Sequence, residues 1–473
     1  MTSTLAPPLR HCGAETEPEH LSPPGDSRAP HVAPLVTVHD AMTFPHQCDP
    51  NTLRERRGLS PRGMRSRVRL VGLDAARGIA LIGMIAVHTF ESTNDAGDMS
   101  LAWVLASGKA SALFAVLAGV GLAFMTGRTR PPRGRDALRA ATIPLVRGAL
   151  IVIIGLVLGG IVDVGDASVV LAYLGVMFVM AAVVVPLRAR SLLVVGFAWA
   201  IVGPILSHLL RQGSPAQAPV NLGLGSLADP LGTLQVLVLT GVFPALTWFA
   251  YICLGMALGR ADLASRLVVA KMLAGGVLLT LMTSVASSIL VGGFGLRERL
   301  ADSVNGTMTL ETFTEYLVFG DSGSLPTTSW WWLGVLSPHS GTPLDLLFTM
   351  GTSLAVIGAC LALAQVFGHR FLLLAVPGGM TLTLYSLHLL LLGPLRGFPD
   401  GLHFAVQLTL LVTFALIWGE HFRRGPMERM LTTLTRILTP RRPSAGTSQP
   451  GVGSPGAIVP TDHVQPRSDM SPA

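Results

Sequence analysis

Long apolar runs alternate with short polar stretches along most of this chain. A run of about 18 or more apolar residues is long enough to cross a bilayer as a helix. The chain contains too many such runs, each too long, for the core of a soluble protein. The pattern therefore predicts an all-α integral membrane protein with about ten transmembrane helices, at residues 71–90, 103–125, 141–162, 167–187, 191–210, 232–258, 268–294, 344–367, 371–393 and 402–420.

The two ends of the chain have a different composition. Residues 1–66 are rich in Pro, Arg, Ser and His and lack an apolar period, and residues 436–473 are rich in Pro, Ser and Gly. Both compositions are typical of disordered segments, so we expect a tail on each side of a membrane domain at 67–435. Met64 opens a plausible alternative start, and part of the first tail is interpreted as a gene-start artefact.

Charges between the apolar runs predict the topology. Arginines gather before the first run and in every second loop, for example at 128–139, whereas the loops between them are acidic or neutral. Because Lys and Arg are enriched in cytoplasmic loops, one topology satisfies all of them: ten spans with both termini cytoplasmic. The longest outside loop is 295–343. Its run Trp330–Trp332 is either an interfacial anchor or a lid or sugar-stacking wall over an outward cavity.

Composition adds a source and excludes some partners. Of the 34 basic residues only Lys109 and Lys271 are lysines, and this arginine bias, with abundant Ala, Gly, Leu and Pro, suggests a GC-rich bacterial genome and thus a bacterial plasma membrane. The net charge of +7 is accounted for by topology and does not indicate a nucleic acid partner. The four cysteines have no metal-binding spacing, so no metal is expected.

The first apolar run, GLDAARGIALIGMIAVHTFE, contains Arg77 and His88. Eleven residues at about 100° each bring the two side chains to within about 20° of one helix face, about 16 Å apart along the axis. Ionisable residues inside a membrane are rare and usually functional. Two ordinary alternatives stay open, namely that Arg77 extends to the cytoplasmic interface and that His88 makes a structural hydrogen bond to a neighbouring helix.

Four more polar residues lie at matching depths. Arg147 is as deep as Arg77, and two guanidiniums at one level suit the phosphates of a nucleotide or coenzyme, although Arg147 could also extend to the interface. Lys109 lies near the depth of His88 and requires an acidic partner or an aqueous cavity. Tyr385 and His388 share one face of the ninth run, with His388 in its outer half. A histidine there suits general-base catalysis.

Several stretches resemble a known family. An arginine and a histidine with ten residues between them in the first span resemble the motif of the membrane acyltransferases that include the O-antigen and peptidoglycan O-acetylases. The first run is more similar to bacterial relatives of heparan-alpha-glucosaminide N-acetyltransferase and to YeiB-like proteins. The resemblance spans about 66–435 and is carried by GLDAARGIALIGMIAVH, SALFAVLAGVGLAFMTGR, SPHSGTPLDLL, GGMTLTLYSLHLLLL and GPMERML.

The resemblance implies acyl transfer across the membrane. Cytoplasmic acyl-CoA, most simply acetyl-CoA, would donate to a hydroxyl or amine of an outside glycan or small molecule. His88 would be the base with His388 second, Arg77 and Arg147 would hold CoA phosphates, and Lys109 or Tyr385 would stabilise the oxyanion. The loop 89–102 lacks the histidine that is catalytic in the heparan enzyme, so the resemblance does not carry that enzyme's mechanism and acceptor over to this chain.

Other functional classes remain alternatives at the level of the sequence. A transporter or proton-coupled permease would use the same residues as a proton relay, although no clear internal repeat is visible. A non-catalytic membrane partner is a third alternative, and self-association into a homo-oligomer stays open. In every case the bilayer is an expected partner.

Overall fold

The structure, a computed structural model, describes residues 61–213, 218–304, 306–320, 324–368, 372–422 and 424–439, with the backbone alone at 61–70 and 372–374. Most of the two expected tails, 1–60 and 440–473, lies outside these ranges. The few tail residues that the structure describes belong to helices, since the first helix begins at Pro61 and the last ends at Leu438.

The described ranges are built from helices and loops, and their only β pairing is one isolated bridge between Thr93 and Met99. This confirms the all-α fold class. The helices are α2 Pro61–Thr89, α3 Leu101–Ala106, α4 Lys109–Met125, α5 Arg135–Gly159, α6 Leu171–Ala181, α7 Ala189–Leu210, η2 Leu224–Ala228, α8 Pro230–Gln235, η3 Val236–Thr240, α9 Ala245–Arg260, α10 Arg266–Gly293, α11 Leu296–Ser303, α12 Leu310–Val318, η4 Trp330–Gly334, α13 Pro343–Phe367, α14 Leu372–Gly378, α15 Thr381–Leu395, α16 Asp400–His421 and α17 Pro426–Leu438.

Seven helical stretches within the described residues are long and apolar enough to cross a membrane, or eight if one bent pair counts as a single span. They make the chain a multi-pass membrane protein. The seven coincide with seven of the ten predicted runs, and they are Val71–Thr89, Leu101–Met125, Arg135–Gly159, Ala189–Leu210, Arg266–Gly293, Pro343–Phe367 and Asp400–His421. The count of ten spans stays a prediction, as does the placement of the termini.

The other three predicted runs are short or broken. The run 167–187 contains only the eleven-residue helix α6. The run 232–258 bends by 58° between Pro230–Thr240 and Ala245–Arg260, where Pro244 precedes α9 and has no N–H to continue a helix. The run 371–393 divides into α14 and α15 at Gly378–Gly379. Broken helices are stable at membrane depth where the protein itself satisfies the freed backbone groups.

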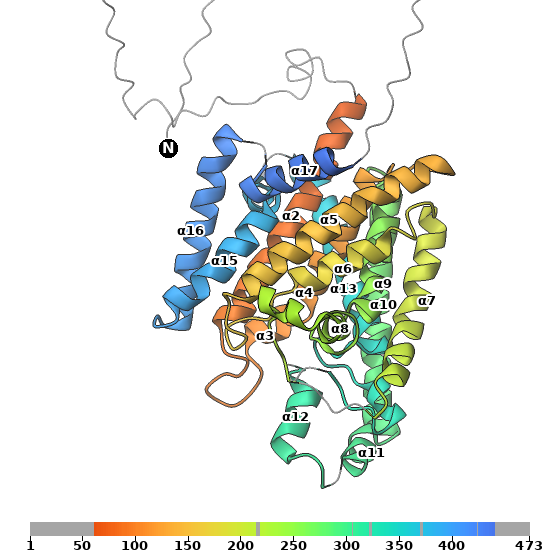
Figure 1. Cartoon of the computed structure of the whole chain (residues 1–473), viewed down its shortest axis with the longest axis vertical. Coiled ribbons are helices and arrows are strands. Elements are labelled where there is room, and N and C mark those ends of the chain that lie inside the picture. The colour runs from red at the N-terminus through yellow and green to blue at the C-terminus, as the bar shows by residue number, and fades with distance from the viewer. Residues whose placement is uncertain are drawn as a thin grey trace, which may run out of the picture. The chain divides into compact units, whose positions relative to one another are not determined.

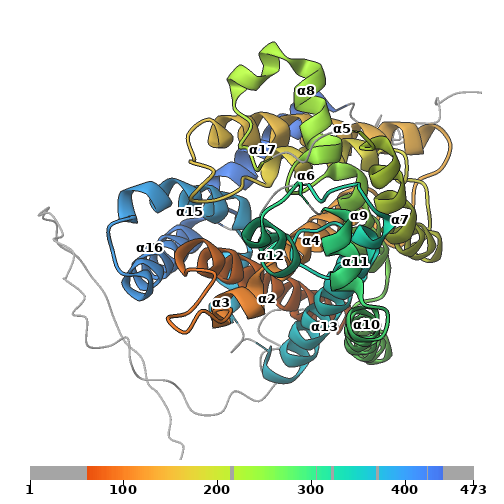
Figure 2. The same cartoon turned by 90° about the horizontal axis from the view of Figure 1, so that it is seen from below.

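Helix α2 joins helices from both halves of the chain. It packs against α3, α4, α13, α14, α15 and α16, and the pairs α4–α9, α5–α6, α7–α9 and α10–α13 make the other extensive helix contacts (Figures 1 and 2). Glycine allows the closest approaches. A Cβ on Gly119 of α4 would lie 2.6 Å from the carbonyl oxygen of Ile252 in α9, and a Cβ on Gly378 would overlap the backbone of Asp74 in α2. Small residues are the usual means of packing helices in a bilayer.

Two segments mark the opposite ends of the bundle in Figure 1. Helix α17 lies across one end, and α11 and α12 lie at the other.

The loop 295–343 has its own hydrophobic cluster, in which Trp332, 1% exposed, packs against Phe313 and Tyr316. Trp330 is 52% exposed and its ring lies 4.5 Å from that of His208. The tryptophan run therefore supplies both a core residue and an exposed ring.

Candidate functional site

An open cavity of about 540 Å³ lies at the α17 end of the bundle. We call it the arginine cavity, because Arg77, Arg147, Arg424 and Arg436 line it together with a single acidic residue, Glu428. Its walls come from α2, α4, α5, α6, the α14–α15 break and α17. The first two arginines are half-buried, and the last two are exposed.

The arginine side chains differ in their partners. Nη1 of Arg77 donates to Asp74 one helical turn earlier, over 2.5 Å. Nη1 of Arg424 reaches the hydroxyl of Thr432 at 3.4 Å. The Nε of Arg147 is buried and has no hydrogen-bond partner. A buried guanidinium nitrogen without an acceptor is costly, and an anionic ligand would satisfy it.

Glu428 caps the helix that begins after the α14–α15 break. Its carboxylate accepts from the backbone N–H groups of Leu382 and Thr383, at 2.7 and 3.2 Å, and from the Thr383 hydroxyl at 2.6 Å. The first N–H groups of a helix have no partner within the helix, and a carboxylate satisfies them well. The negative charge of Glu428 is therefore engaged with α15, which leaves the arginines to set the electrostatic character of the cavity.

A second, small cavity of about 40 Å³ lies beside His88. We call it the histidine cavity. Its walls come from α2, the α3–α4 junction, the loop before α6, the break before α9, the loop before α13, and α15; they include His88, Ser111, Ser168, His339 and Tyr385. The broken stretches predicted as continuous spans therefore supply part of both cavities.

A chain of hydrogen bonds leads from His88 into α16. Nδ1 of His88 lies 2.9 Å from Nε2 of His388, and the two rings are parallel to within 1°. Nδ1 of His388 lies 2.6 Å from Oε1 of Gln407, whose Nε2 lies 2.7 Å from Nε2 of His403. His388 and Gln407 are fully buried, and His403 is 7% exposed. His88 thus makes the interhelical hydrogen bond that the structural alternative requires, and it also lines a cavity.

Two aromatic rings lie between the cavities. Phe114 lines the arginine cavity and Tyr385 lines the histidine cavity, with ring centroids 5.9 Å apart and planes inclined by 26°. Tyr385 is 1% exposed, and its hydroxyl accepts from the N–H of Val170 over 3.4 Å. A tyrosine hydroxyl that accepts in this way still has its own proton to donate to a ligand. Arg77 and His88 therefore share a helix face but open into different cavities.

His339 faces His88 from the loop before α13. Its ring lies parallel to that of Trp248, with centroids 5.9 Å apart, and edge-on to Phe243 at 5.1 Å. Its Nδ1 is buried without a hydrogen-bond partner, and its φ is 59°. Burial lowers the pKa of His339 to about 4, so the imidazole is neutral at pH 7.

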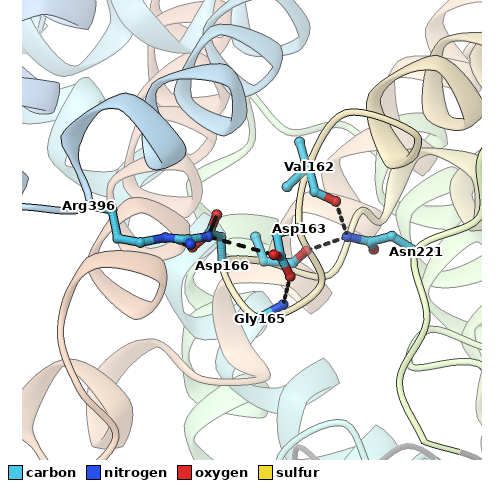
Figure 3. A network of polar contacts seen from close by, with 7 residues as sticks. Val162, Asp163, Gly165, Asp166, Asn221 and Arg396 are labelled. Carbon is cyan, nitrogen blue, oxygen red and sulfur yellow. Dashed lines mark hydrogen bonds and ion pairs between the residues drawn. The ribbon is translucent and has the colours of Figure 1, made fainter.

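The loop that follows α5 is fixed in place from two sides (Figure 3). Arg396, just after α15, makes a bidentate ion pair with Asp166 at 2.5 and 2.9 Å. From the other side, the amide of Asn221 donates to the carbonyls of Val162 and Ala167, and its oxygen accepts from Val169. Ser168 and Val170 of this loop line the histidine cavity, so these contacts set the position of one wall.

The sequence-predicted residues lie in three places. Arg77 and Arg147 line the arginine cavity, while His88, His388 and Tyr385 lie at or beside the histidine cavity. The ammonium of Lys109 donates to the carbonyl of Val104 over 2.6 Å and lies over the Phe348 ring, and Lys109 is not among the residues that line either cavity.

Sequence reasoning missed four residues that the fold brings to these cavities. His403 and Gln407 stand at i and i+4, one face of the tenth apolar run, which was an available signal. Arg424 and Arg436 were visible only as basic residues after the last span. Nothing local indicates that α17 returns to the arginine cavity.

Comparison with known families identifies the first half of the membrane region. Residues 69–288 match the family model described as heparan-alpha-glucosaminide N-acetyltransferase, catalytic. The comparison with curated proteins found no match. The matched range contains Arg77, His88 and Arg147, and the residues that complete the cavities from α15, α16 and α17 lie beyond it. The match over residues 69–288 supports a heparan-alpha-glucosaminide N-acetyltransferase-like family for this part of the chain, and with it an acetyltransferase that is embedded in a membrane.

Proposed function

We propose that this protein moves an acetyl group from cytoplasmic acetyl-CoA to a hydroxyl or amine of an acceptor on the outer side of a bacterial plasma membrane. The acceptor is a glycan or a small molecule. The proposal takes the basic loops as cytoplasmic, with both termini and α17 on the same side, so that the arginine cavity opens inward and the histidine cavity lies nearer the outside. The observation that carries the proposal is that the two cavities meet at an aromatic contact, in which Phe114 of one lining lies against Tyr385 of the other.

The arginine cavity fits the anionic part of acyl-CoA. Its volume of about 540 Å³ is in the range of ligand sites. Half-buried Arg147 has an Nε without an acceptor, and exposed Arg424 and Arg436 lie where the phosphates would enter. Guanidiniums bind phosphate oxygens in pairs, and desolvation inside the cavity strengthens these contacts. Arg77, already paired with Asp74, would act at the inner end of the cavity.

The histidine cavity supplies the base. His88 accepts the proton of the acceptor hydroxyl or amine, whose lone pair attacks the thioester carbonyl carbon. The carbon–sulfur bond then breaks, and the departing thiolate takes the proton back from His88, which gives the acetylated acceptor and free CoA. Tyr385 is better placed than Lys109 to donate to the oxyanion, because the Lys109 ammonium is already bound to a backbone carbonyl.

Access to the histidine cavity requires movement. A volume of about 40 Å³ is too small to hold an acceptor and an acetyl thioester at the same time. We propose that the Phe114 and Tyr385 rings separate when the pantetheine arm enters, and that the acceptor enters past His339. The family match does not favour a transporter, in which the histidines would carry protons across the membrane.

The test uses the full chain in lipid nanodiscs with radiolabelled acetyl-CoA and a panel of amino sugars and glycans. We expect His88→Ala to bind acetyl-CoA normally and to lose about 10²- to 10⁴-fold in turnover. We expect Arg77→Ala to weaken acetyl-CoA binding. His421→Ala, which removes an exposed histidine from the far end of α16, is the matched control and should leave both unchanged.

Two results would contradict the proposal. The first is wild-type protein that binds no acetyl-CoA at millimolar concentration. The second is a His88→Ala variant with wild-type turnover, which would show that His88 is not the base.

A further inference from the structure

Helix α16 places two buried polar side chains in an otherwise apolar stretch. Gln407 is fully buried and His403 is 7% exposed, one turn apart, whereas Thr409 on the same helix is exposed. A buried amide in a membrane protein is costly unless all of its hydrogen bonds are made. Both ends of the Gln407 amide are paired with imidazole nitrogens, at 2.6 and 2.7 Å.

The chemistry of the amide fixes where the protons lie. Oε1 of Gln407 can only accept, so Nδ1 of His388 must carry a hydrogen. Nε2 of Gln407 can only donate, so Nε2 of His403 must present its lone pair. A neutral His388 with its hydrogen on Nδ1 has a bare Nε2, which can accept only from an Nδ1–H of His88, at 2.9 Å.

The consequence reaches the cavity. His88 with its hydrogen on Nδ1 carries its lone pair on Nε2, which has no hydrogen-bond partner among the described residues. We infer that Gln407 and His403 are positioning residues that hold His88 in the tautomer with a basic Nε2. This inference rests on the proposed function, in which His88 is the base.

The reversed orientation of the Gln407 amide would prevent His88 from acting as a base. If the amide of Gln407 were reversed, it would donate to Nδ1 of His388, whose Nε2–H would then donate to Nδ1 of His88. His88 would carry its hydrogen on Nε2 and could not accept a proton there. In the structure the amide nitrogen of Gln407 lies 2.7 Å from Nε2 of His403, and this orientation requires the lone pair of His403 on Nε2, whereas a hydrogen there would favour the reversed amide.

The same arrangement serves both states of the base. After His88 takes up a proton on Nε2, its Nδ1–H still donates to Nε2 of His388, and no hydrogen bond in the chain has to change. Groups that are oriented before the reaction cost no reorganisation during it. The amide of Gln407 therefore has the orienting function that a carboxylate has in serine hydrolase triads.

The experiment compares two replacements of Gln407 in the full chain in nanodiscs. Gln407→Met keeps the size and removes both hydrogen bonds, whereas Gln407→Glu keeps an acceptor for Nδ1–H of His388. Leu411→Met, one turn away on the same buried face, is the packing control, and Thr409→Val is the lipid-side control. We measure turnover, the KM for acetyl-CoA and thermal stability.

We expect Gln407→Met to lose about 10- to 100-fold in kcat with an unchanged KM for acetyl-CoA. Gln407→Glu should recover most of that loss, and both controls should behave as wild type. A second readout does not depend on turnover: carbethoxylation of His88 by diethyl pyrocarbonate, followed by peptide mass spectrometry, should be several-fold slower in Gln407→Met than in wild type.

The results distinguish a failure of the inference about Gln407 from a failure of the proposed function. If wild type transfers acetyl groups and Gln407→Met matches it, the inference is wrong and the proposed function stands. Equal losses in the Met and Glu variants would show that packing, and not the polarity of the amide, is what matters. If wild type transfers nothing, the proposed function fails, and the His88 modification rates alone decide whether Gln407 sets the tautomer.

Discussion

The arginine cavity and the histidine cavity bury polar groups in opposite ways. In the first, four cations surround about 540 Å³ of open space, and the Nε of Arg147 has no acceptor. In the second, about 40 Å³ is lined by uncharged groups, and His88 is the first of four side chains joined end to end by hydrogen bonds. Unsatisfied charge in a large space suits a polyanionic ligand, whereas satisfied neutral groups in a small space suit the orientation of a reacting atom.

The separation of the arginine cavity from the histidine cavity has a chemical reason. In the proposed function, arginines beside His88 would raise the cost of protonating it, and water that entered with the phosphates would hydrolyse the thioester. The contact between Phe114 and Tyr385 lies where it would limit both. Breaking one cavity should therefore leave the function of the other measurable.

Of the changes that compare the two cavities, the largest effect is expected from Arg147, whose Nε has no acceptor. Arg147→Gln should weaken acetyl-CoA binding by about 10- to 100-fold, because a hydrogen bond to a charged group contributes about 1.5–3 kcal/mol. Binding of S-acetyl-N-acetylcysteamine, a donor without phosphates, should not change. Isothermal titration of both donors measures the difference.

Arg139→Gln is the control for that measurement. Arg139 lies on the same helix, is about half exposed, sits 3.9 Å from Asp136, and does not line the arginine cavity. Equal weakening of both donors by Arg147→Gln would mean that the residue supports the fold and does not bind phosphate.

A smaller effect is expected from opening the partition. Phe114→Ala should raise hydrolysis of acetyl-CoA in the absence of acceptor several-fold, because water from the arginine cavity can then reach the Tyr385 side. Phe178→Ala is the control, since Phe178 lines the arginine cavity and is 4% exposed but makes no ring contact with Tyr385. Release of free thiol measures the leak, and a Phe114 variant without one would show that the rings are not the barrier.

The sequence predicted the faces of single helices better than the contacts between helices. The spacing of Arg77 and His88 and that of Tyr385 and His388 follow from helical geometry, and both pairs lie where that geometry places them. Apolar length could not show the breaks in two runs, although a proline in one and two adjacent glycines in the other were visible signals. The approach of α16 and α17 is a tertiary result, and no local pattern specifies which helix Gln407 or Arg436 will face.

The smallest effect tests the neutrality of the histidine cavity. Burial lowers the pKa of His339 to about 4 from about 6.5 when unfolded, so the folded state binds fewer protons than the unfolded state between these values. Stability from this group is therefore complete above about pH 6.5 and is lost as the pH falls toward 4, by up to about 3 kcal/mol. His88 is the titratable group that faces His339, and a charge on His88 adds repulsion.

The variant His339→Asn keeps a residue that tolerates the φ of 59° and removes the titration. Thermal unfolding in nanodiscs between pH 7 and pH 4.5 should show a steeper loss of Tm for wild type than for His339→Asn, by a few degrees at the acid end. Parallel curves would mean that His339 is hydrated in solution, and that the histidine cavity, like the arginine cavity, admits water.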